Sequence, residues 1–445
     1  MRIAVYSLGC KVNQVELEAV EESFRRQGHE MVAYDQPADV YLINTCSVTG
    51  TADRKSRAAI RRARRRSPDA VVAVTGCFGD LAARRGFTPE GADLVIPNAR
   101  KEDAADWILA FLAGHDPALM NTDSGIMLHP RRIEYVERHA RTRAFVKIQD
   151  GCESFCSYCI VPYARGRVRS KLADDILAEI RNLVDLSYRE IVLTGIHIGQ
   201  YGRDLDGLEL NGLLRRIFDE VPGNFRLRLS SLEPLEVKPD LIALLQDEPR
   251  LCRHLHIPLQ SGSETVLRRM NRRYGAAVYA ALLEELAGTI PGIGLTADVM
   301  VGFPGETPEE FGETCALIEK SPLSDLHVFR YSRRPGTAAD RMPDQIPEMV
   351  KNERSQLLIA LGRRKRETFL NELQTAEAVV LTEEEAADGV LGLTDNYVPV
   401  CLDHAAELNT FYRVSLLEPS GLNGQEAVLR AQRKEQIEHI SRLRP

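Results

Sequence analysis

The chain contains the stretch Gly151-Cys152-Glu153-Ser154-Phe155-Cys156-Ser157-Tyr158-Cys159, in which three cysteines form the pattern CxxxCxxC. Because the whole chain has only nine cysteines, three within eight positions require a chemical explanation. Three thiolates this close together suit a metal centre. Structural zinc normally takes four ligands, usually from two CxxC pairs, and the sequence has no second pair. A 4Fe-4S cluster held by three cysteines would leave one iron free for a small molecule. Zinc or plain thiols are the alternatives.

The motif resembles the signature of the radical S-adenosylmethionine (SAM) enzymes. This resemblance implies that Cys152, Cys156 and Cys159 hold a 4Fe-4S cluster and that its open iron binds SAM. It also implies that an electron from the cluster cleaves SAM and releases a deoxyadenosyl radical. The protein itself would then bind, orient and shield the reactants.

Length and composition limit the architecture and the location of the protein. With 445 residues, 44% of them hydrophobic, the chain is long enough for about three domains. The net charge of -7 provides no global basic field that would indicate a nucleic-acid partner. The first residues run directly into a strand-like segment, so we expect no signal peptide and no membrane span. A cytoplasmic enzyme with reduced thiols is therefore predicted.

The first hundred residues alternate between strand-like and helix-like patterns. Strand-like apolar runs are found at residues 3–8, 40–43, 71–74 and 94–96. After the first run, Asn13 reads as a helix cap and Gly28 as the end of that helix. This alternation predicts an α/β domain with a parallel sheet covered by helices.

Three further cysteines, Cys10, Cys46 and Cys77, each lie just beyond the end of a predicted strand. The carboxyl ends of parallel strands share one edge of a sheet, so these cysteines should converge in space. One such cysteine alone would most simply be an ordinary buried residue. Three at equivalent strand ends indicate a shared site, and three thiolates again suit a 4Fe-4S cluster with an open iron.

Together these segments resemble the radical SAM methylthiotransferases. The matching motifs, besides CxxxCxxC, are SLGCKVNQ at 7–14, NTCSVT at 44–49 and TGC at 75–77. The resemblance covers nearly the whole chain. It implies that Cys10, Cys46 and Cys77 hold an auxiliary 4Fe-4S cluster, whose open iron carries the sulfur or methylsulfide that is inserted into a carbon-hydrogen bond.

A strongly basic run occupies residues 53–66, where eight of fourteen residues are cationic. Such a run is either a solvated helix face or a surface that follows the phosphates of a nucleic acid. A second basic segment, RGRVRSK at 165–171, directly follows the cluster loop and has the same two interpretations. The candidate RNA-binding residues from the two segments are Arg54, Lys55, Arg57, Arg61, Arg165 and Arg167.

Residues 1–115 form the predicted N-terminal domain, residues 116–137 a linker, and residues 138–370 the central domain. Six strand-like runs are found in the central domain, at 144–148, 191–193, 225–229, 254–257, 295–301 and 326–331. Helix-like segments between them, such as 174–184, 208–221 and 308–319, make six βα units. This pattern predicts an incomplete barrel of the kind that the radical SAM resemblance implies, with the cluster loop after the first strand.

Active sites of such barrels lie at the carboxyl ends of the strands. The cofactor-binding candidates are therefore strand-end residues together with one residue of the cluster loop: Tyr158, Gly195, His197, Ser231, Glu233, Gln260 and Ser261. The segment LTGIHIG at 193–199 is a degenerate form of the superfamily's glycine-rich segment, and His197 could equally be a structural histidine.

The C-terminal region, residues 371–437, follows a polar helix predicted at 347–373. Five short strand-like runs occur at 378–381, 390–393, 397–402, 412–416 and 427–429. They predict a small antiparallel barrel, and the region resembles the RNA-binding TRAM domain. Its acidic run at 383–385 argues for a weak electrostatic hold on RNA. Tyr397 is either a stacking surface for bases or a core residue.

Within the family, the motifs are most similar to the branch that acts on threonylcarbamoyladenosine. The resemblance implies methylthiolation of carbon 2 of N6-threonylcarbamoyladenosine next to the anticodon of tRNA, with two SAM molecules and two 4Fe-4S clusters. Isopentenyladenosine in tRNA is the alternative substrate. Expected partners are tRNA and an electron donor such as flavodoxin or ferredoxin, and a monomer is expected. An iron-sulfur electron carrier and a zinc-holding RNA-binding module are the rival classes. Cys252, Cys315 and Cys401 match no ligand position.

Overall fold

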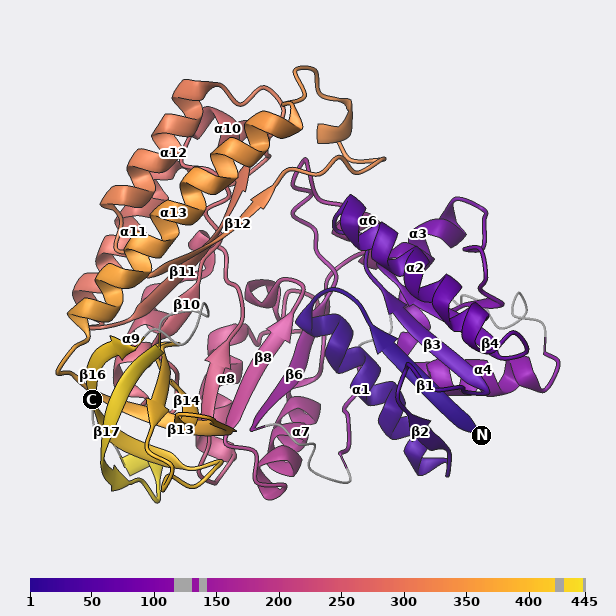
Figure 1. Cartoon of the computed structure of the whole chain (residues 1–445), viewed down its shortest axis with the longest axis horizontal. Helices are drawn as coiled ribbons and strands as arrows, with labels where there is room; N and C mark the ends of the chain where they lie inside the picture. The colour runs from indigo at the N-terminus through magenta and orange to yellow at the C-terminus, as the bar shows by residue number, and fades with distance from the viewer. Residues whose placement is uncertain (116–129, 136–141, 421–427, 443–445) are drawn as a thin grey trace.

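The computed structural model describes residues 1–115, 130–135, 142–420 and 428–442. Three regions follow one another along the chain, as Figure 1 shows: an N-terminal sheet with its helices, a central array of strands and helices, and a small C-terminal barrel. The predicted α/β class is confirmed. No helix in these described ranges is long and apolar enough to cross a membrane.

The N-terminal region is built on a five-stranded sheet in the order β2-β1-β3-β4-β5. Its strands are β1 (Arg2–Ser7), β2 (Glu30–Val32), β3 (Val40–Thr45), β4 (Val71–Gly76) and β5 (Leu94–Val95). All four pairings are parallel, which confirms the prediction. The helices are α1 (Lys11–Arg26), α2 (Gly50–Arg66), α3 (Cys77–Arg84) and α4 (Ala104–Leu112), with the 3-10 helix η1 (Asn98–Asp103) before α4. All six residues of the central strand β3 are buried, as expected for an apolar strand covered on both faces.

The start of α1 differs from the prediction. Cys10 occupies the cap position and Asn13 lies inside the first turn. The Asn13 side chain donates hydrogen bonds to the carbonyl oxygens of Leu8 (2.7 Å) and Thr45 (3.1 Å). Asn13 was wrongly predicted as the cap because these carbonyls at the ends of β1 and β3 engage its amide instead.

The central region contains the six predicted parallel strands, and the incomplete barrel is confirmed. They are β6 (Arg143–Asp150), β8 (Glu190–Gly195), β9 (Arg226–Leu229), β10 (His254–His256), β11 (Gly294–Val301) and β12 (Asp325–Arg330). They form the sheets β7-β6-β8-β9 and β10-β11-β12, and a parallel bridge between Leu227 and Leu251 links the two. The short strand β7 (Arg169–Ser170) pairs antiparallel with β6.

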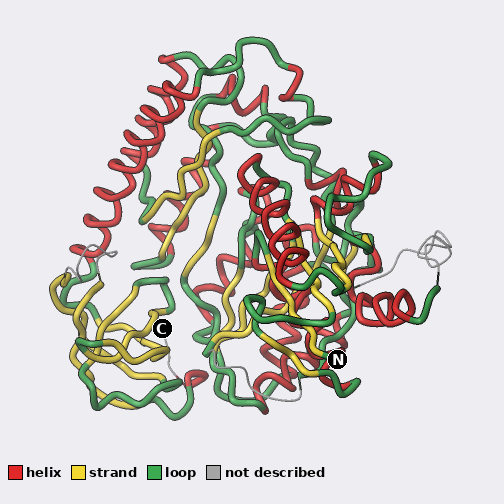
Figure 2. The backbone as a smooth tube through the Cα atoms, turned by 45° about the vertical axis from the view of Figure 1, so that its right-hand side comes forward, coloured by secondary structure: helices red, strands yellow, loops and turns green. Residues whose placement is uncertain are grey.

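Helices follow these strands and cover the array. They are α6 (Val161–Arg165), α7 (Ala173–Asp185), η2 (Ile198–Gln200), α8 (Leu210–Glu220), η3 (Pro234–Glu236), α9 (Pro239–Asp247), α10 (Glu264–Arg269), α11 (Ala276–Thr289), α12 (Pro308–Lys320), η4 (Ala339–Arg341) and α13 (Glu348–Glu372). The helix α12 begins at a capping box in which Thr307 and Glu310 satisfy each other's backbone N–H groups. The last helix, α13, runs along one side of the central region and leads to the C-terminal barrel, as Figure 2 shows.

Most of the predicted linker lies outside the described residues. The part at 130–135 is packed against the central region, because Ile133 and Tyr135 are buried in its hydrophobic core. The backbone N–H of Ile133 donates to a Glu179 carboxylate oxygen (3.0 Å), and that of Tyr135 to the Asn182 side chain (2.9 Å). This short part is therefore fixed to α7. The domain boundaries as a whole stay a prediction.

The C-terminal region is a closed barrel in the order β13-β14-β15-β17-β16. The strands are β13 (Glu377–Ala386), β14 (Gly389–Thr394), β15 (Pro399–Leu402), β16 (Phe411–Ser420) and β17 (Val428–Gln436), followed by η5 (Ile440–Arg442). The five predicted strands are confirmed, but one pairing is parallel: β15 with β17, where Val400 lies opposite Leu429. An odd number of strands cannot close with antiparallel pairs alone, so two strands of the same direction must meet.

The C-terminal barrel contacts the amino ends of the central strands. Arg226 and Arg228 of β9 donate hydrogen bonds to the carbonyl oxygens of Leu393 (2.9 Å) and Thr394 (3.0 Å), respectively. The Tyr397 ring stacks on His254, with centroids 4.6 Å apart, and Arg228 lies 5.0 Å from the centre of the same ring. Tyr397 therefore contacts the central region, and because 37% of the residue is exposed, its role as a stacking surface for RNA bases stays a prediction.

Candidate metal centres and cofactor pocket

The CxxxCxxC loop follows β6 directly, at the carboxyl ends of the central strands, as predicted. Its three cysteines are free thiols. The Cys152 sulfur accepts the backbone N–H of Ser154 (3.4 Å) and lies 3.5 Å from Nδ1 of His197. A guanidinium nitrogen of Arg272 lies 3.3 Å from the Cys156 sulfur. Hydrogen-bond donors at the sulfurs are typical of iron-sulfur sites and help to set their potential.

The charged groups around the loop change the acidity of its thiols. Burial alone would raise the pKa of Cys152, but hydrogen bonds from His197 and Ser154 lower it below the ordinary value. Burial raises the pKa of Cys156, and the Arg272 charge opposes that rise. The His197 ring also contacts Glu236, with Nε2 2.6 Å from Oε1. Burial alone would lower the pKa of His197, but its contacts with Cys152 and Glu236 raise this pKa to about 9.

A pocket of about 150 Å³ opens beside the loop, lined by Cys156, His197, Glu233 and Arg272 among others. Two of the predicted cofactor residues, His197 and Glu233, therefore face one pocket. The hydroxyl of a third, Tyr158, lies 3.5 Å from Arg272. This pocket stands where a barrel normally binds its ligand, at the carboxyl ends of the strands.

The other predicted cofactor residues have different surroundings. Ser261 is fully buried and its hydroxyl lies 3.2 Å from that of Thr314, so it acts as a structural link between α12 and the loop after β10. Gln260 is buried, and its Oε1 has no hydrogen-bond partner among the described residues. Ser231 is exposed. Gly195 ends β8 against the carbonyl of Gln149, where an added Cβ would lie 2.9 Å from that oxygen.

Sequence reasoning missed Arg272. Besides contacting Cys156, its guanidinium pairs with the Glu233 carboxylate and lies 4.9 Å from the centre of the Tyr274 ring. Arg272 follows a helix, not a strand, so the rule of strand-end residues did not select it. The available signal was the run NRRY at 271–274, which is adjacent to no predicted strand.

The strand-end cysteines lie at the ends of three neighbouring strands, because β1, β3 and β4 are adjacent in the sheet. Cys46 and Cys77 are buried and Cys10 is exposed, and all three are free. The loop before Cys10 touches Cys46, since a Cβ added to Gly9 would lie 2.8 Å from the Cys46 Cβ. Burial raises the pKa of Cys46 to about 11, and the nearby Cys77 and Cys10 contribute to the rise. The structure thus brings these strand ends together.

The two triads are neighbours across the boundary between the N-terminal and central regions. Cys77 and Leu81 of α3 form a hydrophobic cluster with Ile160 and Ala164, which follow the CxxxCxxC loop. Burial raises the pKa of Cys159 to about 12, and Cys77 is among the groups that add to this rise. Cys77 of the strand-end triad therefore lies next to the segment that follows the other triad.

Each triad offers three soft thiol donors, which fit an iron-sulfur cluster with one iron left open. In the part of the chain that the structure describes, no group of three or more His, Cys, Asp or Glu side chains is arranged to hold a single metal ion.

The predicted RNA-binding residues fall into two groups. Exposed residues are Arg54, Lys55, Arg57 and Arg61 of α2, together with Arg167. Arg165 is buried, and its guanidinium pairs with the carboxylates of Glu16 and Asp150 at 2.8 Å each. The structure thus corrects the prediction for Arg165, which is enclosed by carboxylates and cannot reach a phosphate.

An incomplete six-unit barrel with this cysteine loop and pocket defines a radical SAM enzyme. The chain matches the Radical SAM superfamily over residues 146–318 and the uncharacterized protein family UPF0004 over residues 2–96. It is 40% identical to threonylcarbamoyladenosine tRNA methylthiotransferase MtaB of Bacillus subtilis (strain 168), over 98% of each chain. The protein of the same name from Aquifex aeolicus (strain VF5) is 34% identical, over 93% of this chain and 100% of that one. This chain belongs to the radical SAM tRNA methylthiotransferases.

The chain is also similar to an enzyme named for a different modified adenosine and to a solved structure with a similar fold. The chain is 36% identical to tRNA-2-methylthio-N(6)-dimethylallyladenosine synthase of Moorella thermoacetica (strain ATCC 39073 / JCM 9320), over 80% of this chain and 81% of that one. Among solved structures, the radical S-adenosylmethionine methyltransferase TsrM from Kitasatospora setae, with cobalamin and a 4Fe-4S cluster bound, has a TM-score of 0.57. It shares 15% sequence identity over 76% of this chain and 77% of that one, and so shows the fold alone. Family membership implies that the chain uses SAM and a 4Fe-4S cluster.

Proposed function

We propose that this chain methylthiolates carbon 2 of N6-threonylcarbamoyladenosine next to the anticodon of tRNA. The observation that carries the proposal is that Cys77, from the strand-end triad, packs against the segment after the CxxxCxxC loop, while Cys156 of that loop lines a pocket at the strand ends. Two relatives that bear the name of this activity align with 98% and 93% of the chain. Isopentenyladenosine is the second candidate, supported by the relative from Moorella thermoacetica.

In this proposal Cys152, Cys156 and Cys159 hold the cluster that binds SAM, and Cys10, Cys46 and Cys77 hold an auxiliary cluster. When bound, the first cluster supplies the electron that cleaves SAM and the second supplies the sulfur. Two SAM molecules are consumed for each product, because one provides the methyl group and the other provides the radical that removes hydrogen from carbon 2. An electron donor such as flavodoxin or ferredoxin is needed, and the chain acts as a monomer.

The protein residues bind and orient the reactants. His197 and Glu233 line the pocket next to the cluster loop, where SAM would lie. The buried Oε1 of Gln260 has no partner among the described residues, so it is available to accept a hydrogen bond from the cofactor. Arg272 contacts both Cys156 and Glu233 and holds the loop against the pocket wall.

The outer face of α2 is the proposed contact with the tRNA backbone. Arg54, Lys55, Arg57 and Arg61 are exposed there, and Arg62 and Arg65 extend the same face. Arg64 is excluded because it pairs with Asp93. Arg167, near the cluster loop, is a further candidate. Phosphate contacts of this kind position an RNA without reading its sequence.

The tRNA contact is tested by replacing Arg61, Arg62 and Arg65 with Glu. Binding should weaken, and the slope of log K against log salt should fall by roughly one for each lost phosphate contact. Replacement of three other exposed arginines, Arg341, Arg363 and Arg364, with Glu is the control for net charge. Equal effects of the two sets of changes would reject α2 as the contact.

The function itself is tested by metal and nucleoside analysis. The wild-type protein, reconstituted anaerobically, should contain about eight iron and eight sulfide per chain, and each triple Cys-to-Ala variant about four. Changing Cys252, Cys315 and Cys401 to Ala is the matched control and should leave iron unchanged. Wild-type iron that never exceeds four would reject the auxiliary cluster. Incubation with tRNA that carries either modified adenosine identifies the substrate, and methylthio product from isopentenyladenosine alone would favour the second candidate.

A further inference from the structure

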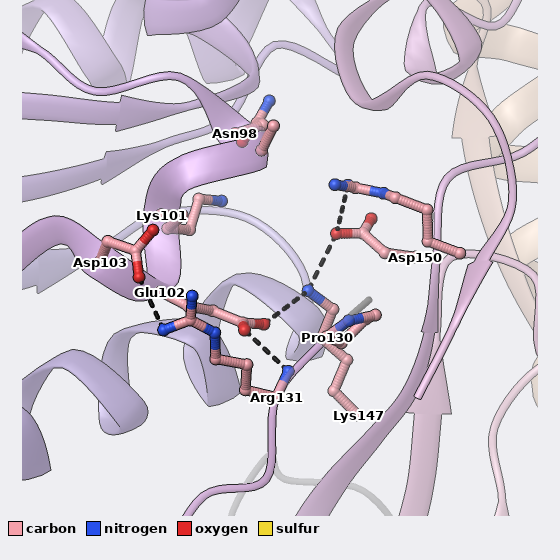
Figure 3. Close-up of a pocket in the computed structure, with 10 residues that line it drawn as sticks. Asn98, Lys101, Glu102, Asp103, Pro130, Arg131, Lys147 and Asp150 are labelled. Atoms are coloured by element: carbon pink, nitrogen blue, oxygen red, sulfur yellow. Dashed lines mark hydrogen bonds and ion pairs between the residues drawn. The ribbon is translucent and has the colours of Figure 1, made fainter. Parts of the chain in front are cut away.

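A buried network of ion pairs lies between the N-terminal sheet and the cluster loop. Its members come from α1, η1, β6, α6 and β7: Glu16, Lys101, Glu102, Lys147, Asp150, Arg165 and Arg169. Figure 3 shows part of it, with Lys147 between Glu102 and Asp150. Because buried ion pairs lose most of their attraction to desolvation, stability alone is a weak reason for such a network.

Within this network, Arg165 and Lys147 of the central region both pair with Glu16 of the N-terminal region, and Arg165 also contacts Asn13. Arg165 ends α6, six positions beyond Cys159, and its side chain is 1% exposed. Its two terminal nitrogens donate to the two oxygens of Glu16, at 2.8 and 3.1 Å. They also donate to Asp150 (2.8 Å) and to the side-chain oxygen of Asn13 (2.6 Å). Such forked contacts fix direction as well as distance.

Asn13 connects Arg165 to the loops that carry two of the strand-end cysteines. With its oxygen held by Arg165, its nitrogen donates to the carbonyl oxygens of Leu8 and Thr45. Leu8 is two residues before Cys10, and Thr45 directly precedes Cys46. The Asn44 side chain in turn donates to the Asn13 carbonyl oxygen (2.7 Å). One amide therefore holds the backbone of two cysteine loops in a position set by Arg165.

The third cysteine, Cys77, is the first residue of α3, and it packs against Ala164 of α6 in one hydrophobic cluster. Asn98 ties α3 to α6, since its backbone N–H donates to Asp80 (3.1 Å) and its side chain donates to the Ala164 carbonyl oxygen (2.9 Å). Asn98 thus fixes the helix that begins at Cys77 to the helix that ends at Arg165.

We propose that Arg165 is a positioning residue that fixes the strand-end triad relative to the CxxxCxxC loop. It would thereby hold the sulfur source at one place relative to the pocket where the radical is generated. This inference rests on the proposed function, because it requires both triads to carry clusters. It assigns a role to an arginine that the sequence alone places on the surface.

Arg165→Met tests the inference. Arg165→Lys is the second variant, because it retains the positive charge but cannot donate two parallel hydrogen bonds to the Glu16 carboxylate. Lys171→Met is the matched control, because Lys171 and Glu179 form an equally buried pair (2.6 Å) in the same region. Asn13→Ala removes the amide that links Arg165 to the two loops, while the contacts of Arg165 with Glu16 and Asp150 remain. For each reconstituted protein, iron content, SAM cleavage, methylthio product and the magnetic coupling between the two reduced clusters are measured.

We expect Arg165→Met to cleave SAM within about threefold of wild type but to form about 10–100-fold less product per SAM cleaved. Its magnetic coupling should change, Arg165→Lys should restore part of the product, and Asn13→Ala should alter only the strand-end cluster. Lys171→Met should resemble wild type. Equal losses in Lys171→Met and Arg165→Met would overturn the inference, as would unchanged coupling and product ratio in Arg165→Met. A wild-type protein that lacks the second cluster would instead reject the proposed function.

Discussion

His254, the first residue of β10, stacks on Tyr397 in the loop between β14 and β15, with ring centroids 4.6 Å apart. The amino ends of the central strands thus carry the C-terminal barrel. The cysteine loop, the pocket and the N-terminal sheet lie at the opposite, carboxyl ends of these strands.

Tyr397→Ala should weaken the attachment of the C-terminal barrel. The ring loses its stacking on His254 and its contact with Arg228, which together are expected to contribute about 1–3 kcal/mol. Thermal unfolding and limited proteolysis of the C-terminal barrel measure the effect. Leu357→Ala, at a position that is 60% exposed on α13, is the control and should change stability by less than about 0.5 kcal/mol. Equal behaviour of the two variants would show that the stacking contributes nothing.

The same interface should weaken in acid. Burial would raise the pKa of Asp395, but Arg253, whose Nε lies 2.7 Å from Oδ2, holds it below the ordinary value together with Arg226 and Arg228. A lowered pKa stabilises the fold above the unfolded value of about 3.9, and this contribution is lost as the pH falls further.

Urea unfolding at several pH values tests this dependence. Asp395→Asn should be less stable than wild type at pH 7, and the difference should shrink below about pH 4. Curves for wild type and variant that stay parallel down to pH 3 would contradict the assignment of the pair. The exposed Asp206→Asn is the control, because that residue has no partner in this interface.

Gly151→Ala should disrupt the cluster loop. Gly151 has φ +73°, and a Cβ there would lie 1.8 Å from the Arg167 carbonyl oxygen, so the backbone would have to move. Gly166 has nearly the same φ, +75°, with nothing within 4 Å of an added Cβ. Gly166→Ala should therefore cost only backbone strain, about 1–3 kcal/mol, because its φ of +75° and ψ of -154° form a conformation that glycine alone adopts readily.

Iron content and melting temperature of these two variants provide the test. Gly151→Ala should lose more stability than Gly166→Ala, by at least about 2 kcal/mol, and should lose iron from the CxxxCxxC site. Similar losses in both variants would mean that the backbone conformation, and not the close approach to Arg167, makes glycine necessary at 151.

Arg272→Gln should slow SAM cleavage about 10–100-fold while the iron of the loop is retained, because the residue supports the Cys156 sulfur and Glu233 from outside the cluster. Arg272→Lys should be intermediate, since a lysine keeps the charge but cannot reach both partners. The exposed neighbour Arg273 also lines the pocket, and Arg273→Gln should stay within about threefold of wild type. Equal rates in both Gln variants would remove the assigned role of Arg272.

Secondary structure and the cysteine pattern were predictable from the sequence. The six strands of the central region and the five of the C-terminal barrel all appear where apolar runs predicted them. Cys10, Cys46 and Cys77 could be placed on one edge because parallel strands share the direction of their carboxyl ends. These inferences depend on local periodicity and on the geometry of sheets, both of which a single sequence contains.

The partners of polar and aromatic side chains were decided by the tertiary structure. The local sequence predicted Asn13 to be a helix cap and Arg165 to be a surface cation. It predicted Tyr397 to be either a base-stacking ring or a core residue. Their actual contacts are distant in sequence: Arg165 lies 152 positions from Asn13 and 149 from Glu16, and Tyr397 packs on His254. The local sequence determined which segments form strands and helices, because their apolar periodicity is sufficient for burial. Only the folded chain determined which charges are buried together, because a hydrogen bond depends on the position of both partners.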